Sequence, residues 1–164
     1  MKIKSLIGSI ENVNVDGLVL GLFSDDKKLT GDLALLDKRL GGSIQHALAL
    51  GDISGKAGQM GRFYTHGKIK ATRLLICGLG KRSEFTVEGL RSKMANIISK
   101  AKNLNVHTLA FTTIGASEAD LSLGDFAHVM ADTAFLSNFH YDQFTIKSGD
   151  LKPAEDAHKV STLF

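Results

Sequence analysis

The sequence predicts an α/β domain in which a largely parallel sheet is flanked by helices. A short continuous apolar run at residues 74–77 is closed by glycines, as expected for a strand that is covered on both faces. An amphipathic segment follows, and a second apolar run, residues 106–111, comes next. Strand, glycine turn, helix and strand in this order indicate a βαβ unit, whose crossover is expected to be right-handed.

The helix of this unit is predicted to begin after Thr86, whose hydroxyl can cap it. Its apolar side chains recur at spacings of three and four residues, while charged side chains occupy the other face. The apolar positions are Val87, Leu90, Met94, Ile97, Ile98 and Ala101. This spacing places one face of the helix against the sheet.

Further strands are predicted in the first half of the chain. Residues 2–10 alternate weakly between apolar and polar and can form an edge strand. Residues 15–23 contain an apolar run that indicates a strand buried on both faces. Residues 60–65 and 70–76 would be neighbouring strands joined around residues 66–67.

Two short helices are predicted between these strands. Thr30 or Asp32 can cap the first, which the glycines at residues 41–42 stop. A second helix is expected over residues 44–50. The glycine-dense residues 51–58 then form a loop.

The last part of the chain is predicted to hold one more long helix, capped by Ser122. Its apolar face would consist of Phe126, Val129, Met130, Ala134, Phe135 and Phe139. A short strand is expected over residues 141–146. The domain would therefore span residues 1–147, and the polar residues 148–164, which include the only proline, would form a linker or tail.

Composition and charge indicate one globular domain and argue against several classes of partner. With 43% hydrophobic and 23% charged residues, the 164-residue chain can bury a sizeable core in one domain. The net charge of +3 is small and Lys and Arg are spread along the chain, so nucleic acid and anionic membranes are disfavoured as partners. No apolar stretch approaches the ~20 residues that span a bilayer, and residues 1–7 lack the apolar length of a signal peptide. We expect a cytoplasmic protein.

One glycine-rich turn has a composition that suggests phosphate binding. Gly78, Gly80 and Lys81 follow a predicted strand and precede a helix, where open α/β sheets bind phosphates. Both complete patterns fail, because Ser83 stands where the dinucleotide fingerprint needs glycine and Arg82 where a P-loop needs Ser or Thr. A plain tight turn is therefore the favoured interpretation.

Other candidate residues are scattered. The six histidines are His46, His66, His107, His128, His140 and His158, and none has a second His or a Cys at ligand spacing. Asp125 lies three residues before His128, which is typical of a surface or capping contact rather than a metal site. The sequence shows no Ser, His and Asp set, although such sets are spatial.

The remaining reactive residue types also favour structural roles. The neighbouring Asp25 and Asp26 are expected to point apart into solvent. Lys81 and Arg82 would be a solvated strand end, and the single cysteine, Cys77, would be a small core residue in a reducing compartment. With one cysteine, no intrachain disulfide and no cysteine metal cluster can form. We therefore assign no catalytic, cofactor-binding or metal-binding role to any position.

Several blocks of sequence resemble the N-terminal domain of the leucyl (cytosol) aminopeptidases. They are residues 29–42 (LTGDLALLDKRLGG), 50–58 (LGDISGKAG), 73–82 (RLLICGLGKR) and 85–91 (FTVEGLR). Residues 141–147 (YDQFTIK) resemble the stretch that closes that domain. Order and spacing agree over most of residues 15–147, which is far more specific than a single glycine motif.

This resemblance implies a fold, a parent activity and partners. The domain would be a macro-domain-like three-layer α/β sandwich. The family members are metallo-aminopeptidases whose two divalent metals, zinc or manganese, and whose catalytic residues lie in a C-terminal domain. We therefore expect no hydrolysis by this chain alone, which would meet peptide substrate only through that domain. The intact enzyme would be a homohexamer in which this domain contributes to subunit packing.

Two alternatives stay open at this point. Residues 41–48 resemble the glycine-rich loop and helix with which macro domains hold the distal part of ADP-ribose, and residues 15–20 sit where the first binding strand would be. However, residues 21–23 (GLF) replace the asparagines that usually follow that strand and cannot supply their hydrogen bonds. The other alternative is an interaction module that binds neither substrate nor small ligand.

Overall fold

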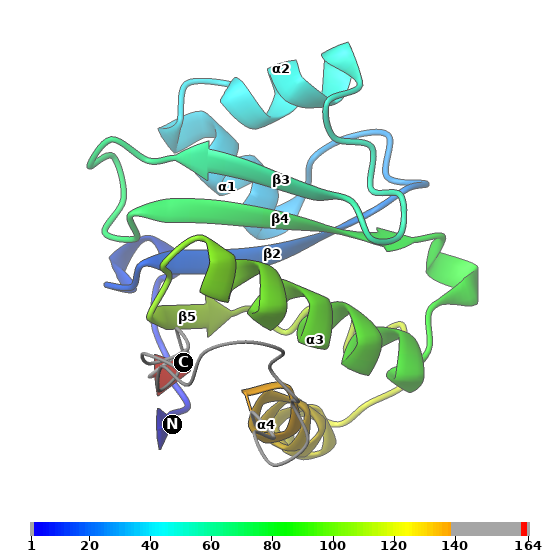
Figure 1. Ribbon diagram of the computed structural model, residues 1–164. Coiled ribbons are helices and arrows are strands. Elements are labelled where there is room, and N and C mark those ends of the chain that lie inside the picture. The colour runs from blue at the N-terminus through cyan, green and yellow to red at the C-terminus, as the bar shows by residue number, and fades with distance from the viewer. Residues whose placement is uncertain (1, 139–161, 164) are drawn as a thin grey trace, which may run out of the picture.

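The computed structural model describes residues 2–138 and 162–163, and within them one mixed sheet lies between two layers of helices (Figure 1). The strands are β1 (Lys2–Ile3), β2 (Gly17–Phe23), β3 (Met60–Tyr64), β4 (Arg73–Gly80), β5 (Thr108–Phe111) and β6 (Thr162–Leu163). Their spatial order is β1-β6-β5-β2-β4-β3. All neighbouring strands are parallel except β3 and β4, which are antiparallel.

Two helices cover each face of this sheet (Figure 1). The helices are α1 (Gly31–Arg39), α2 (Ser43–Leu50), α3 (Val87–Asn103) and α4 (Leu123–Asn138), with 3-10 turns η1 (Ile10–Asn12) and η2 (Arg82–Glu84). Side chains of α3 and α4 share one hydrophobic cluster with the sheet, and those of α1 and α2 share the other. The predicted three-layer α/β sandwich is confirmed.

Strand β2 joins the two cores. Leu18 and Leu20 belong to the cluster on the α1 and α2 face, whereas Val19 and Phe23 belong to the cluster on the α3 and α4 face. Successive side chains of a strand point to opposite faces, so an apolar run of this kind is buried on both sides. The prediction of a doubly covered strand is thereby confirmed for β2.

The predicted βαβ unit exists, but its two strands are not neighbours. β4, α3 and β5 follow one another along the chain, and β2 lies between β4 and β5 and is parallel to both. Thr86 caps α3 as predicted, because its Oγ1 accepts a hydrogen bond of 3.1 Å from the N–H of Gly89. Periodicity alone could not show that β2 enters between the strands, since it reports elements and not their neighbours.

The predicted edge strand over residues 2–10 is largely wrong. Only Lys2–Ile3 form a strand, and Leu6 and Ile7 are exposed. A weak alternation does not make a strand where no neighbouring strand pairs with its backbone and no layer covers its apolar side chains. Residue Ile10 instead begins the 3-10 turn η1.

The apolar face of α4 is confirmed at four positions and wrong at one. Phe126, Val129, Met130 and Ala134 are buried. Phe135 is 56% exposed, because it lies about 100° around the helix from Ala134 and so leaves the buried stripe. Phe139, the strand expected over residues 141–146 and the boundary after residue 147 lie outside the described residues. In the part of the chain that the structure describes, no helix is long and apolar enough to cross a membrane.

Candidate functional site

The tight turn predicted at Gly78 and Gly80 is wrong, because both glycines belong to β4 and pair with β2. This end of β4 is covered by another part of the chain. The N–H of Gly78 donates to the carbonyl oxygen of Gln59 at 2.8 Å, and the N–H of Gly80 donates to that of Gly55 at 2.9 Å. A Cβ atom at Gly78 would collide with the carbonyl oxygen of Lys56. The loop before β3 therefore crosses the end of β4 where a phosphate would have to approach, and it uses the backbone donors that such a ligand needs.

The side chain of Arg82 lies at the same edge of the sheet and contacts other side chains there. Its Nη2 is 2.7 Å from Oδ1 of Asp26, and its Nη1 pairs with Glu118. Its guanidinium carbon lies 4.2 Å from the ring centre of Phe23. The hydrogen bond to Asp26 raises the pKa of Arg82, so the side chain stays charged. Arg82 is exposed, as predicted for a solvated strand end, but the sequence did not predict its contacts with Asp26 and Glu118.

Asp25 and Asp26 meet at Arg82, although the sequence suggested that they point apart. Asp25 accepts a hydrogen bond of 3.3 Å from the N–H of Arg82, while Asp26 binds its guanidinium and also accepts from the N–H of Phe23 at 3.1 Å. Both carboxylates act as hydrogen-bond acceptors in a structural contact. Because the contact joins residues 56 or more positions apart in sequence, local pattern could not predict it.

The start of α2, which resembles a ligand-binding loop of macro domains, holds a carboxylate of the chain itself. Oδ1 of Asp37 accepts hydrogen bonds from the N–H groups of Ile44 at 2.8 Å and Gln45 at 3.1 Å. These N–H groups have no partner within the helix, and such donors favour a negative charge. With Asp37 in this place, a phosphate would meet both an occupied helix start and a like charge.

The histidines that the structure describes belong to no cluster that could bind a metal ion. His46, His66, His107 and His128 lie in the described residues, and His140 and His158 lie outside them. Over residues 2–138 and 162–163, no group of three or more His, Cys, Asp or Glu side chains could hold a metal ion. Asp125 makes a capping contact with Ser122, and His128 makes a surface contact in which its Nε2 lies 3.4 Å from Asp132, so both residues have the kind of contact that the sequence favoured.

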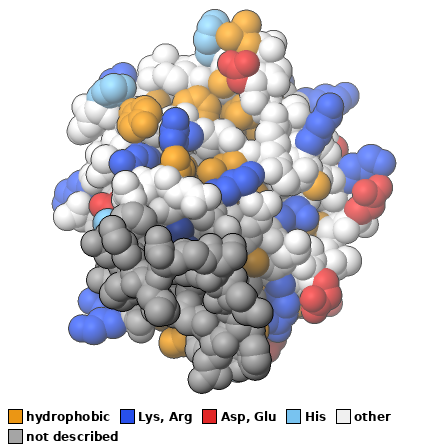
Figure 2. All heavy atoms as spheres, viewed as in Figure 1, with side chains coloured by type: hydrophobic (Ala, Val, Ile, Leu, Met, Phe, Trp, Pro, Cys, Tyr) orange, Lys and Arg blue, Asp and Glu red, His pale blue; other side chains and the backbone are white. Residues whose placement is uncertain are grey.

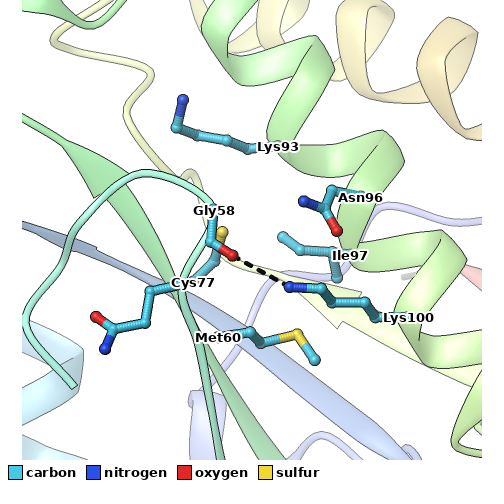
Figure 3. Close-up of a pocket in the computed structure, with 8 residues that line it drawn as sticks. Gly58, Met60, Cys77, Lys93, Asn96, Ile97 and Lys100 are labelled. Carbon is cyan, nitrogen blue, oxygen red and sulfur yellow. Dashed lines mark hydrogen bonds between the residues drawn. The ribbon is translucent and has the colours of Figure 1, made fainter. Parts of the chain in front are cut away.

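Cys77 lies at the base of a small hollow between the loop before β3 and α3 (Figure 3). It is 4% exposed, and burial raises the pKa of its thiol to about 11, although Lys93 and Lys100 act to lower it. At neutral pH the side chain is a thiol, which is the poor nucleophile of the two forms. Its environment fits a core residue.

A shallow, open depression of about 340 Å³ lies next to the hollow above Cys77, at the edge of the sheet. Both share Met60 and Lys100, so we treat them as one feature and call it the β3–α3 groove. The side chains that shape it are Met60 and Arg62 of β3 and Lys93, Ile97, Lys100 and Leu104 on or just after α3. In Figure 3, Lys93 and Lys100 project from the same helix, and Nζ of Lys100 donates to the carbonyl oxygen of Gly58 at 3.1 Å.

The groove is positively charged. Arg62, Lys93 and Lys100 form no ion pair with any carboxylate of the described residues. Figure 2 shows hydrophobic side chains interspersed with Lys and Arg over the region of β3 and β4. Sequence reasoning missed this feature because its residues come from two distant segments. The available signal was the pair of lysines seven residues apart, which share one face of α3.

Comparison with known proteins identifies the family. A sequence model described as the N-terminal domain of the cytosol aminopeptidase family matches residues 19–148. A probable cytosol aminopeptidase of Sulfurihydrogenibium sp. (strain YO3AOP1) is 29% identical over 160 residues, which are 98% of this chain and 30% of that protein. The chain therefore spans less than a third of the length of this relative.

Two solved structures place the fold. A mutant of tomato leucine aminopeptidase has a TM-score of 0.74 and 20% identity, with 99% of this chain and 32% of that chain covered. The macrodomain of Mycobacterium tuberculosis DarG has a TM-score of 0.65 and 15% identity, with 82% of this chain and 90% of that chain covered. At such identities the likeness concerns the fold alone. The match over residues 19–148 shows that the chain belongs to the cytosol aminopeptidase family and carries its N-terminal domain.

Proposed function

We propose that this chain is the non-catalytic N-terminal domain of a cytoplasmic leucyl aminopeptidase and that it serves the packing of subunits. The observation that carries the proposal is the family match over residues 19–148. The parent enzyme would release N-terminal amino acids from peptides with two divalent metal ions, zinc or manganese, which a C-terminal domain would hold. The peptide substrate would be bound there as well.

The described residues do not fit such a metal pair. Two divalent ions need several carboxylate, imidazole or thiolate ligands that converge, and no three such side chains converge in the part of the chain that the structure describes. The only cysteine is a buried thiol with a raised pKa. These observations support a location of the metal chemistry outside this domain.

Exposed apolar side chains on α4 support the packing role. Leu123 is 71% exposed, Phe135 56% and Leu136 75%. Phe135 and Leu136 both lie in the last turn of the helix and both are exposed. Such exposed apolar area is typical of a surface that another domain or subunit covers. We propose that this end of α4 contacts the catalytic domain or a second subunit of the assembled enzyme.

Light scattering tests the packing role. We expect the 164-residue chain to be a monomer or weak dimer and the longer product of its reading frame to be a hexamer, because stable interfaces bury about 1,000 Å² or more. In the longer product, Phe135→Ser combined with Leu136→Ser should weaken the assembly. The matched change Leu50→Ser, at an exposed position of α2, should leave it intact. A stable hexamer of the 164-residue chain would show that the contacts have been misplaced.

The macro-like alternative is a nucleotide-binding module. The macrodomain neighbours share the fold, and one of them, from Trypanosoma brucei, was solved in complex with ADP. In this chain, Asp37 occupies the start of α2 and Arg82 binds across the end of the sheet. We therefore expect isothermal titration with ADP-ribose to show no saturable heat, and clear saturable heat would favour the alternative.

A further inference from the structure

Strand β3 has a free hydrogen-bonding edge, because among the described strands it pairs with β4 alone. The N–H of Gly78 donates to Gln59 and the N–H of Thr65 donates to Thr72, so residues 59 and 65 direct their backbone groups toward β4. Backbone direction alternates along an antiparallel strand. The N–H and C=O groups of Met60, Arg62 and Tyr64 therefore point away from the sheet.

The side chains of these three residues lie on the face of the sheet that α3 covers further along. Met60 and Arg62 line the β3–α3 groove, whereas the intervening Phe63 packs against the core on the opposite face. Tyr64 is exposed, and the guanidinium carbon of Arg62 lies 5.5 Å from its ring centre. A strand added beside β3 would thus place alternate side chains next to Met60, Arg62 and Tyr64.

The positive charge beside β3 determines which kind of strand could pair with its free edge. The only charged side chain at these three positions is the cation Arg62, and Lys93 and Lys100 of the groove add positive charge that no described carboxylate pairs with. A second copy of β3 paired antiparallel about Arg62 would bring two guanidinium groups together, which is destabilising. Natural proteins use such charges to prevent pairing of identical edges. An added strand with a carboxylate next to Arg62 would be attracted by its positive charge, whereas a second copy of β3 would be repelled by it.

We propose that β3 and the β3–α3 groove form a docking surface for an extended acidic peptide segment of another protein. The segment adds to β3 as a strand and places a carboxylate next to Arg62, between apolar side chains next to Met60 and Tyr64. Apolar, any, acidic, any, apolar is a pattern that reads the same in both directions, so it fits parallel and antiparallel addition. This binding is separate from the aminopeptidase role.

A peptide fits this surface better than a nucleic acid does. The free edge offers alternating N–H and C=O groups in strand register, and only another peptide backbone matches both. The apolar Met60 and Leu104 in the groove also suit side chains rather than phosphates. Three cations are few for a nucleic-acid surface, whose affinity depends on many phosphate contacts.

The probe is a fluorescein-labelled heptapeptide with blocked ends, Thr-Leu-Thr-Glu-Thr-Leu-Thr, titrated with the 164-residue chain. We expect a saturable rise in anisotropy at concentrations below about 1 mM. Bound peptide should slow hydrogen exchange at the amides of Met60, Arg62 and Tyr64. A peptide with Gln in place of Glu should bind about tenfold more weakly, because a charge-assisted hydrogen bond to Arg62 is lost.

Charge reversal locates the surface. Arg62→Glu should weaken binding about tenfold or more, and Lys38→Glu, at an exposed position of α1 on the opposite face, should leave it unchanged. If Arg62→Glu does not fold, Lys100→Glu supplies the same test. No saturable binding, equal effects of both reversals, or slowed exchange elsewhere would overturn the proposal. A short DNA duplex that binds more tightly and displaces the peptide would instead make this face a nucleic-acid surface.

Discussion

Arg82 shows how one side chain can join segments that are distant in sequence. It binds Asp26, which follows β2, and Glu118, which lies between β5 and α4, while it covers the ring of Phe23. Phe23 in turn meets Phe85 edge to face, with ring centres 5.4 Å apart. The ends of two parallel strands and the connection after a third are held together by this contact.

Replacement of Arg82 should therefore lower the free energy of unfolding. We expect Arg82→Ala to cost about 1–2 kcal/mol, because a half-exposed ion-pair network and a cation–π contact are lost together. Lys81→Ala, which removes only the exposed pair with Glu84, should change stability by less than about 0.5 kcal/mol. Urea unfolding followed by circular dichroism measures both. Equal effects would show that Arg82 has no structural role beyond its charge.

Asp16 is a second residue whose role is visible only in the fold. Burial alone would raise the pKa of its carboxyl, but the N–H groups of Thr108 and His107, each 2.9 Å from Oδ2, outweigh burial and lower the pKa below its ordinary value of 3.8. A carboxylate with a lowered folded-state pKa stabilises the fold above its unfolded pKa. That stabilisation is lost as pH falls through the folded-state pKa.

The free energy of unfolding should accordingly fall as pH drops below about 4, and Asp16 should contribute to the fall. Asp16→Asn should cost about 1 kcal/mol at neutral pH, where the charged hydrogen bonds are lost, and should flatten the acid part of the profile. Asp32→Asn, at an exposed position of α1, is the control. Urea unfolding across the acid range measures both profiles. An unchanged acid profile in Asp16→Asn would contradict this assignment.

Gly78 determines how the loop before β3 lies over β4. A Cβ at this position would collide with the backbone of Lys56, which cannot move without releasing the bonds that the loop makes to Gly78 and Gly80. We expect Gly78→Ala to lower the free energy of unfolding by about 2 kcal/mol or more. Gly124 lies in the first turn of α4, where a Cβ meets nothing closer than 3.8 Å.

Gly124→Ala should therefore be neutral or stabilise the domain by up to about 1 kcal/mol, because alanine favours helices. Thermal unfolding of the two variants beside the parent chain makes the comparison. If both substitutions had the same effect, the close approach of the loop to β4 would not be a source of stability.

The helices were predicted well because their signals are local. Thr86 and the three-and-four spacing after it fix α3 without reference to any other part of the chain. The edge strand predicted at residues 2–10 was largely wrong, because a weakly alternating segment forms a strand only if another strand pairs with it. The sequence does not show which strand that would be. For the same reason, the insertion of β2 between β4 and β5 could not be derived from periodicity.

The β3–α3 groove and the Arg82 contact could not be predicted for the same reason, because they depend on contacts between distant segments. The family resemblance supplied the three-layer sandwich from blocks of contiguous sequence, and the residue types and their spacing led to the assignment of no catalytic residue. The β3–α3 groove and the Arg82 contact depend on pairs such as Met60 with Lys100 and Asp26 with Arg82. Such pairs are set by strand register and helix packing, which a single sequence does not reveal.

At the scale of the whole molecule, the described residues occupy the edge where a ligand would bind and leave apolar and positively charged side chains exposed elsewhere. The edge that binds nucleotides in many α/β proteins is occupied by the chain's own Asp37 and Arg82. Exposed apolar side chains lie near the end of α4, and the positive groove lies along β3. This distribution of surface favours contacts with protein over chemistry on a small molecule.

Whether this domain lacks catalysis is decided by an assay of leucine p-nitroanilide hydrolysis with added manganese or zinc. The assay compares the 164-residue chain with the longer product of its reading frame, with the Sulfurihydrogenibium relative as a reference. We predict hydrolysis by the longer product and none by the 164-residue chain at matched concentrations. Metal-dependent hydrolysis by the 164-residue chain would contradict the proposed function, because it would require a metal site within this domain.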